Sequence, residues 1–188
     1  ILSHKENEFY IVEDNIHLIR KTILKDIGII HIPTVIINKY KIKIAFIENY
    51  KYYEDQLFYL ENIMKNIKIG FINSIGCRVN ATEGSLFCPT SLNARVNRYK
   101  HEYKARKFFY EKYNNYLEFF DVRKLRLSMA DKIKIIGNYT RASGNFEKAK
   151  IYYFKSLKTM PLIYILKKLK ILYKIILVSL KKSNSILI

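Results

Sequence analysis

The sequence predicts an α/β segment followed by an all-helical region, with the change near residue 90. Short runs rich in β-branched and aromatic residues are typical of strands, and glycines punctuate them, at residues 34–37, 67–72 and 77–79. After Pro89, apolar residues recur at helical spacing to the end of the chain. We therefore expect two parts, one at residues 1–90 and one at residues 91–188.

Each expected element has a local signal. In the first part, isoleucines spaced for one apolar face predict a helix at residues 15–26, and a second helix opens at residue 54 with apolar residues at helical spacing behind it. In the second part, four stretches keep that spacing, at residues 93–116, 122–140, 146–158 and 162–182. No Ser/Gly-rich linker separates the two parts.

Two adjacent carboxylates, Glu54 and Asp55, stand where a loop gives way to the helix that opens at residue 54. One interpretation is that the pair stabilises the helix start, because free backbone N–H groups and the positive end of the helix dipole favour negative charge there. The other is that a carboxylate at the rim of a cleft acts as a general base. The pair alone leaves both open.

The order of segments around this pair resembles the second half of a family 2 glycosyltransferase with the GT-A fold. The run HIPTVIINKYKI at residues 31–42 precedes the E-D pair, and an IGFI strand and a TEGS segment follow it. The resemblance covers residues 30–90 and, loosely, the C-terminal helices. It implies that residues 1–90 form the C-terminal part of a GT-A-like catalytic domain with a partial sheet.

The resemblance also implies a chemistry. A nucleotide-sugar donor would be attacked by a hydroxyl of a glycan or lipid-linked acceptor in an inverting displacement. Asp55 matches the base of the family, Glu54 would orient the loop or the acceptor, and Ser85 matches a segment that closes over the donor. Arg78 is a candidate contact to the donor phosphate, and the alternative is an ordinary surface arginine. The family's divalent cation, Mg²⁺ or Mn²⁺, would be held in the full-length parent by a D-x-D motif.

This chain departs from the family where the donor binds. It has no D-x-D motif and no nucleotide-binding strand before residue 30, so no metal is expected on this chain alone. The chain begins at Ile1 without an initiator Met, which suggests a fragment. If the resemblance holds, the donor half is missing and the isolated chain is inactive.

A helical hairpin at residues 130–163 has the pattern of a tetratricopeptide repeat. Gly137, Ala149, Tyr153, Ser156 and Pro161 fall at the offsets of Gly, Ala, aromatic, small and Pro in that motif. The small residues allow two antiparallel helices to approach closely, and Pro161 ends the second. Because only one repeat is present, we expect a hairpin packed on other helices rather than a peptide-binding array.

The formal net charge of +18 suggests an anionic partner, although a chain saturated in Lys, Ile, Asn, Tyr and Phe also indicates A/T-rich codons. The alternative function is therefore a basic, non-catalytic nucleic-acid-binding or helical interaction protein. Its basis is the interleaved Lys and Tyr of residues 95–116, which also fit a packed helix face. Nucleic acid is the less favoured partner, because no recognised binding motif accompanies them.

The last helix, at residues 162–182, is basic and amphipathic. One apolar row runs along it, and most of its lysines lie off that row: Leu162, Ile165, Leu166, Leu169, Leu172, Tyr173, Ile176, Leu177 and Leu180 form the row, and Lys167, Lys168, Lys170, Lys174 and Lys181 are the lysines. The lysines break any apolar span of about 20 residues, so we expect no transmembrane helix. The row either covers the core or dips into an anionic leaflet. We expect a cytoplasmic protein, peripheral at the inner face of the membrane.

Overall fold

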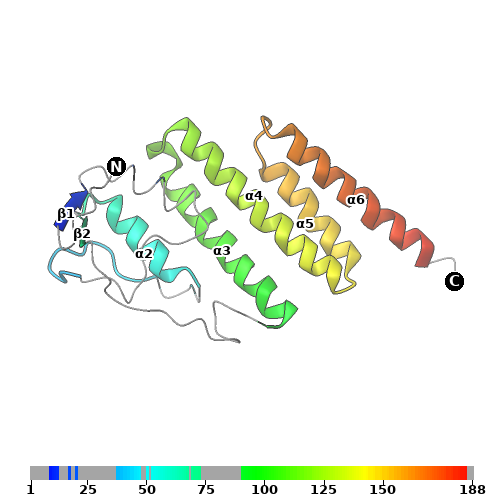
Figure 1. The fold of residues 1–188 in the computed structure, drawn as a ribbon, viewed down its shortest axis with the longest axis horizontal. Coiled ribbons are helices and arrows are strands. Elements are labelled where there is room, and N and C mark those ends of the chain that lie inside the picture. Colours follow the sequence, from blue (N-terminus) through cyan, green and yellow to red (C-terminus); the bar gives the residue numbers. More distant parts are fainter. Residues whose placement is uncertain are drawn as a thin grey trace. The chain divides into compact units, whose positions relative to one another are not determined.

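The computed structural model describes residues 9–12, 17, 20, 37–47, 50, 52–67, 69–72 and 90–185. The chain divides into two compact units, Ile1–Asn80 and Ala81–Ile188, so the predicted change near residue 90 falls inside the second unit. Figure 1 shows the helices and strands coloured along the sequence. Ser85 and Arg78, the two residues that the resemblance placed at the donor, lie outside the described residues, as do 34–36 and 77–79 of the expected strands.

The predicted α/β class, with its partial GT-A-like sheet, is wrong for the described residues. The strands among them are β1 (Phe9–Val12) and β2 (Ile69–Ile72), which pair antiparallel with Phe9 opposite Ile72 and Val12 opposite Ile69. An α/β core needs several parallel strands covered by helices, and two antiparallel strands of four residues each do not supply one. The described chain is otherwise helical or irregular, and the resemblance to a GT-A glycosyltransferase loses its structural basis.

The physical reason for the error is the isoleucine content of the first unit. Short apolar runs rich in Ile predict a strand by composition, but their pattern alone does not decide between a strand and other structure. Ile37, at the end of the expected strand at residues 34–37, lies in irregular chain, whereas the expected run at 67–72 contains β2.

In the first unit, Asn62 of α2 (Glu54–Ile63) fixes an irregular loop against the helix. Its side-chain oxygen accepts hydrogen bonds from the backbone N–H groups of Lys43 and Ile44, at 3.0 and 3.1 Å. Its amide nitrogen donates to the carbonyl oxygens of Ile44 and Phe58, at 2.9 and 2.8 Å. These four bonds use the full capacity of an Asn side chain, so a buried amide is completely satisfied.

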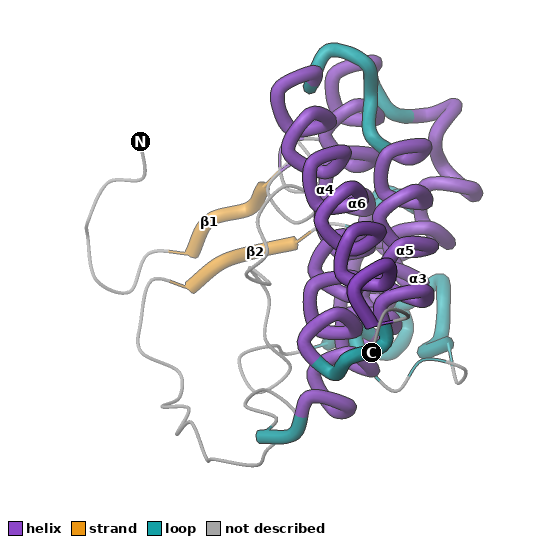
Figure 2. Tube along the Cα trace, turned by 90° about the vertical axis from the view of Figure 1, so that its right-hand side faces the viewer, coloured by secondary structure: helices purple, strands orange, loops and turns teal. Residues whose placement is uncertain are grey.

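The second unit is a row of long helices: α3 (Leu92–Tyr113), α4 (Phe119–Ala142), α5 (Phe146–Thr159) and α6 (Ile165–Ser185), with the 3-10 turn η2 (Asn114–Tyr116) between the first two. Successive helices run antiparallel and pack on their neighbours, and α6 lies at one edge of the row (Figures 1 and 2). The four helices predicted after Pro89 are confirmed, with ends that differ by no more than three residues.

Local signals set the ends of these helices. The Ser91 hydroxyl accepts a hydrogen bond from the backbone N–H of Ala94, and the Asn145 side-chain oxygen accepts one from Lys148, so both residues are N-caps. Gly144 has φ +81 in the turn between α4 and α5, where a residue with a Cβ would be strained.

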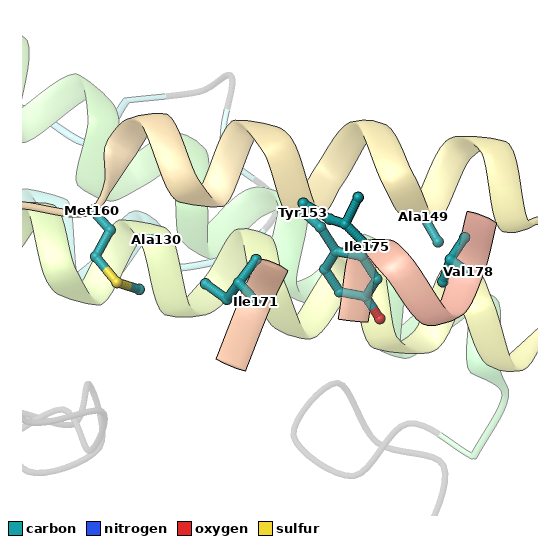
Figure 3. Close-up of a cluster of buried hydrophobic side chains, with 7 residues drawn as sticks. All are labelled: Ala130, Ala149, Tyr153, Met160, Ile171, Ile175 and Val178. Carbon is teal, nitrogen blue, oxygen red and sulfur yellow. The ribbon is translucent and has the colours of Figure 1, made fainter. Parts of the chain in front are cut away.

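One hydrophobic cluster joins three of the helices. Figure 3 shows its buried side chains, which come from α4, α5, the turn after α5, and α6: Ala130, Ala149, Tyr153, Met160, Ile171, Ile175 and Val178. Ala130 and Ala149 are fully buried and give the aromatic ring of Tyr153 its place between the helices. The large side chain of Tyr153 thus shares the cluster with a small residue of its own helix, Ala149, and a small residue of α4, Ala130.

The approach of α4 to α5 depends on Gly137. A Cβ built on this glycine would lie 2.7 Å from Cε1 and 2.9 Å from Cδ1 of Tyr153, closer than real side-chain contacts. Tyr153 is fully buried and cannot move aside without disturbing the cluster. Glycine is therefore required at 137 for a packing reason rather than for its backbone conformation.

We predict that Gly137→Ala lowers the free energy of unfolding by about 1–3 kcal/mol, the usual cost of overpacking a core. Alanine is the better helix former by about 1 kcal/mol, so the measured loss is the clash minus that gain. Urea denaturation followed by circular dichroism measures it. In a Tyr153→Leu background the same change should be neutral or stabilising, because the ring is gone; an equal loss in both backgrounds would refute the contact.

Candidate functional site

The two carboxylates predicted as a site lie in the first turn of α2. Its N-cap residue, Tyr53, has φ 66 and offers no side-chain hydrogen bond to the helix. Asp55 Oδ1 instead accepts a hydrogen bond from the backbone N–H of Gln56 at 2.8 Å. Asp55 therefore satisfies one of the free N–H groups of the helix start, which is the first of its two interpretations.

The carboxylate of Asp55 also acts on a neighbouring tyrosine. Burial raises the pKa of Tyr59, and the negative charge of Asp55 raises it further. Among the described residues, no group of three or more His, Cys, Asp or Glu side chains could hold a metal ion. Glycosyl transfer with Asp55 as base stays a prediction, and the described residues supply neither the sheet nor a metal group on which it would rest.

The tyrosines of α3 are used inside the second unit. The ring of Tyr99 lies 5.9 Å from that of Tyr139, and the ammonium group of Lys132 lies 5.6 Å from the centroid of Tyr99. The ammonium group of Lys155 lies 4.7 Å from the centroid of Tyr103. These contacts occupy ring faces that base stacking would need, so they favour the packed-helix interpretation of residues 95–116 over the nucleic-acid one.

A buried ion cluster ties α3 to α4. Oε1 of Glu102 lies 2.7 Å from Nη1 of Arg106 and 2.8 Å from Nζ of Lys132, and the Glu102 and Lys132 side chains are 2% and 6% exposed. Nε of Arg106 donates to the Ser128 hydroxyl at 2.9 Å. A buried carboxylate with two cations is an internal clamp rather than a ligand site, and loss of one partner would leave a buried charge uncompensated.

The strongest candidate surface is on α6, which has two apolar faces. Ile171, Ile175 and Val178 pack into the cluster of Figure 3 and are at most 6% exposed. This packed face was not predicted from the sequence, although its residues recur at helical spacing. The opposite face carries most of the predicted apolar row, and eight members of that row are between 42% and 83% exposed: Leu162 in the turn just before the helix, and Ile165, Leu166, Leu169, Leu172, Tyr173, Ile176 and Leu180 on α6 itself.

We call these eight residues the outer face of α6. Since α6 lies at the edge of the helical row, none of the described helices of the second unit covers this face (Figure 2). Soluble monomers rarely expose contiguous apolar patches larger than a few hundred Å², and such patches mark interaction sites. A helix that is apolar on two opposite sides is normally covered on both.

Lysines border the outer face along both edges. Lys168 lies three residues after Ile165 and four before Leu172, so it borders one edge; Lys170 lies four residues after Leu166 and three before Tyr173, so it borders the other. Lys170 is exposed and Lys168 partly so. Long lysine stems can lie along apolar surface while the ammonium groups remain in water.

The charged side chains of α6 itself are all positive. Ten lysines and no Asp or Glu follow Glu147 in the sequence. In the part of the chain that the structure describes, no helix is both long enough and apolar enough to span a bilayer. The arrangement thus combines an exposed apolar face with a basic border on a helix that does not span.

Comparison with known proteins gives no relative. No protein-family model matches the chain, no curated protein matches it, and no solved structure matches it.

We predict that Asp55→Asn lowers the stability of the first unit by about 0.3–1 kcal/mol at low salt, because the negative charge at the helix start is lost while an oxygen can still accept from Gln56. Asp55→Ala removes the acceptor as well and should cost more, up to about 2 kcal/mol. Urea unfolding at low and high salt separates the two terms. Equal stability of all three proteins at low salt would contradict the role in the helix start.

Proposed function

We propose that this chain is a helical module that binds peripherally to an anionic membrane surface through α6. The observation that carries the proposal is the outer face of α6, a row of exposed apolar side chains directly opposite the face that packs on the core. An interfacial helix has this pattern, with apolar residues that enter the boundary of the acyl chains and lysines that remain among the headgroups.

The basic border sets the kind of membrane. A lysine close to an anionic leaflet contributes about 1 kcal/mol of attraction, so Lys168 and Lys170 add to the hydrophobic term only where lipids are negatively charged. A stable peripheral attachment takes two signals, and α6 offers both an apolar face and a polybasic border. Packing on α5 holds the helix in shape, so little conformational entropy is lost on binding.

A second copy of the chain is a less favourable cover for the outer face. A symmetric pairing through α6 would bring together two segments that carry only positive charge, since no carboxylate follows Glu147. Like charges placed opposite each other are destabilising, and no acidic residue on this helix is available to pair with Lys168 or Lys170.

We predict that Leu169→Gln combined with Ile176→Gln weakens binding to mixed phosphatidylcholine and phosphatidylglycerol vesicles by about 100-fold, because each side chain loses roughly 1.5 kcal/mol of apolar burial. Both residues are more than half exposed, so stability should change by less than about 0.5 kcal/mol. Co-sedimentation measures the binding. Ile151→Gln is the matched control, an isoleucine of α5 that is 65% exposed and should be silent.

Sedimentation equilibrium tests the alternative, in which a second copy of the chain covers the outer face. If the protein is a dimer that the double variant dissociates, and vesicle binding is absent or unchanged, then a second copy covers the outer face and the proposal is wrong.

We predict that Lys168→Gln combined with Lys170→Gln weakens binding to the same vesicles by about 30-fold, which is the loss of roughly 1 kcal/mol for each lysine. The effect should shrink as salt is raised, because screening weakens the attraction. Lys148→Gln with Lys158→Gln removes the same charge from exposed positions on α5 and should have a much smaller effect. Equal losses in the two pairs would mean that net charge, and not the border of α6, attracts the protein.

A further inference from the structure

A set of polar side chains lines the side of α4 that faces α6. Lys134, Asn138 and Arg141 follow one another at spacings of four and three residues and therefore share one face of α4. Lys174 of α6 reaches this face, where its ammonium nitrogen lies 2.7 Å from Oδ1 of Asn138. We call these four residues the α4–α6 polar cluster.

The orientation of Asn138 is fixed by two donors. Its Oδ1 accepts a hydrogen bond from the Tyr153 hydroxyl at 3.1 Å and another from Lys174. Both lone pairs of this oxygen are then used. The amide nitrogen of Asn138 keeps two N–H donors that no described side chain or carbonyl accepts.

The cations of the cluster are only partly compensated. Asp131 is the carboxylate on this face of α4; it pairs with Lys134, and its Oδ2 lies 3.8 Å from the ammonium group of Lys167. The side chain of Arg141 forms no hydrogen bond or ion pair with any described residue. Lys174 has a neutral amide oxygen, and no described carboxylate, as its partner.

The pKa shifts of the titratable groups agree with this excess of positive charge in the cluster. Burial lowers the pKa of Lys174, and the positive charges of Lys134 and Arg141 lower it further. The phenol of Tyr153 is the titratable group that α5 brings to this place, and burial raises its pKa, so it stays neutral. A half-buried ammonium group among other cations is costly until an anion joins it.

We infer that the α4–α6 polar cluster binds the phosphate group of an anionic phospholipid, an inference that rests on the proposed membrane function. Phosphate oxygens are acceptors, and the cluster presents N–H donors that no described group accepts: those of the Asn138 amide, those of the Arg141 guanidinium, and the N–H groups that Lys174 does not use toward Asn138. The planar fork of a guanidinium group matches two oxygens of one phosphate.

The position of the cluster points to a lipid rather than to a soluble phosphate. Leu166, Lys170 and Lys174 are spaced four residues apart and form one line along α6. That line leads from the exposed outer face, through its basic border, to Asn138. A lipid with its acyl chains against the outer face can therefore place its headgroup among the donors.

The test compares headgroups at matched surface charge. Vesicles of phosphatidylcholine with phosphatidic acid are set against vesicles with phosphatidylglycerol, adjusted to the same zeta potential. We expect the wild type to prefer phosphatidic acid, whose phosphate monoester leaves more oxygens open to the donors. Arg141→Gln and Asn138→Asp should each abolish this preference, with a loss of about tenfold, since a hydrogen bond to a charged group is removed or opposed.

The two variants keep the fold for separate reasons. Arg141 makes no described bond that its replacement would break, and an Asp at 138 still accepts from Tyr153 and Lys174 while it supplies the missing negative charge internally. Arg126→Gln removes the same charge elsewhere on α4 and should keep the preference. Nuclear magnetic resonance of the Lys174 side chain, titrated with glycerol 3-phosphate, should show a rise in its pKa that both cluster variants lack.

The outcomes separate the two proposals. Equal binding of the wild type to both vesicle types with no response of Lys174 to glycerol 3-phosphate, or an unchanged preference in Arg141→Gln, overturns the phosphate site and leaves membrane binding through the outer face intact. A response of Lys174 to glycerol 3-phosphate without any headgroup preference means that the site takes a soluble phosphate and overturns the lipid assignment. Absence of binding to every vesicle overturns the membrane function itself, and the lipid assignment with it.

Discussion

The contacts of Tyr153 hold the second unit together. Its ring fills the space that Gly137 leaves on α4, and its hydroxyl bonds to Asn138, which in turn accepts from Lys174 of α6. A single fully buried side chain thus sets the distance between α4 and α5 and fixes the amide that α6 meets. The direction of that amide decides which donors remain open, so the polar cluster depends on the hydrophobic core beneath it.

The clamp at Glu102 acts between the other pair of helices in the same way. Its carboxylate is shared by Arg106 of α3 and Lys132 of α4, so the α3–α4 contact includes a buried ion cluster where the α4–α5 contact is mainly apolar. This cluster and the ring contacts of Tyr99 and Tyr103 engage α3 inside the second unit, whereas α6 keeps an exposed apolar face bordered by lysines. This difference is why the edge helix, and not the Tyr-rich one, is the surface on which a partner can act.

Local signals explain how much could be predicted from the sequence. Asn145, Pro161 and the helical spacing after Pro89 act within a few residues, and the helices of the second unit follow from them. The α/β class predicted for the first unit was wrong because Ile-rich runs alone do not distinguish a sheet from other structure. The order of segments around Asp55 was interpreted as that of a glycosyltransferase family, which the fold does not support. The outer face of α6 could be recognised in the sequence as apolar residues at helical spacing. Only the burial of side chains in the structure shows which of the two apolar rows is packed. Asn138 and Lys174 are 36 positions apart, and no pattern in the chain pairs them.

The two apolar sides of α6 also govern how the protein behaves as a solute. In water, molecules of this protein repel one another because each carries a formal net charge of +18, and this repulsion is the main factor that keeps their outer faces apart. Salt at about 0.15 M confines that repulsion to roughly 8 Å, and salting-out ions strengthen apolar association at the same time. Dilute buffer therefore keeps the molecules dispersed, and a rise in ionic strength weakens the repulsion that keeps one outer face away from another.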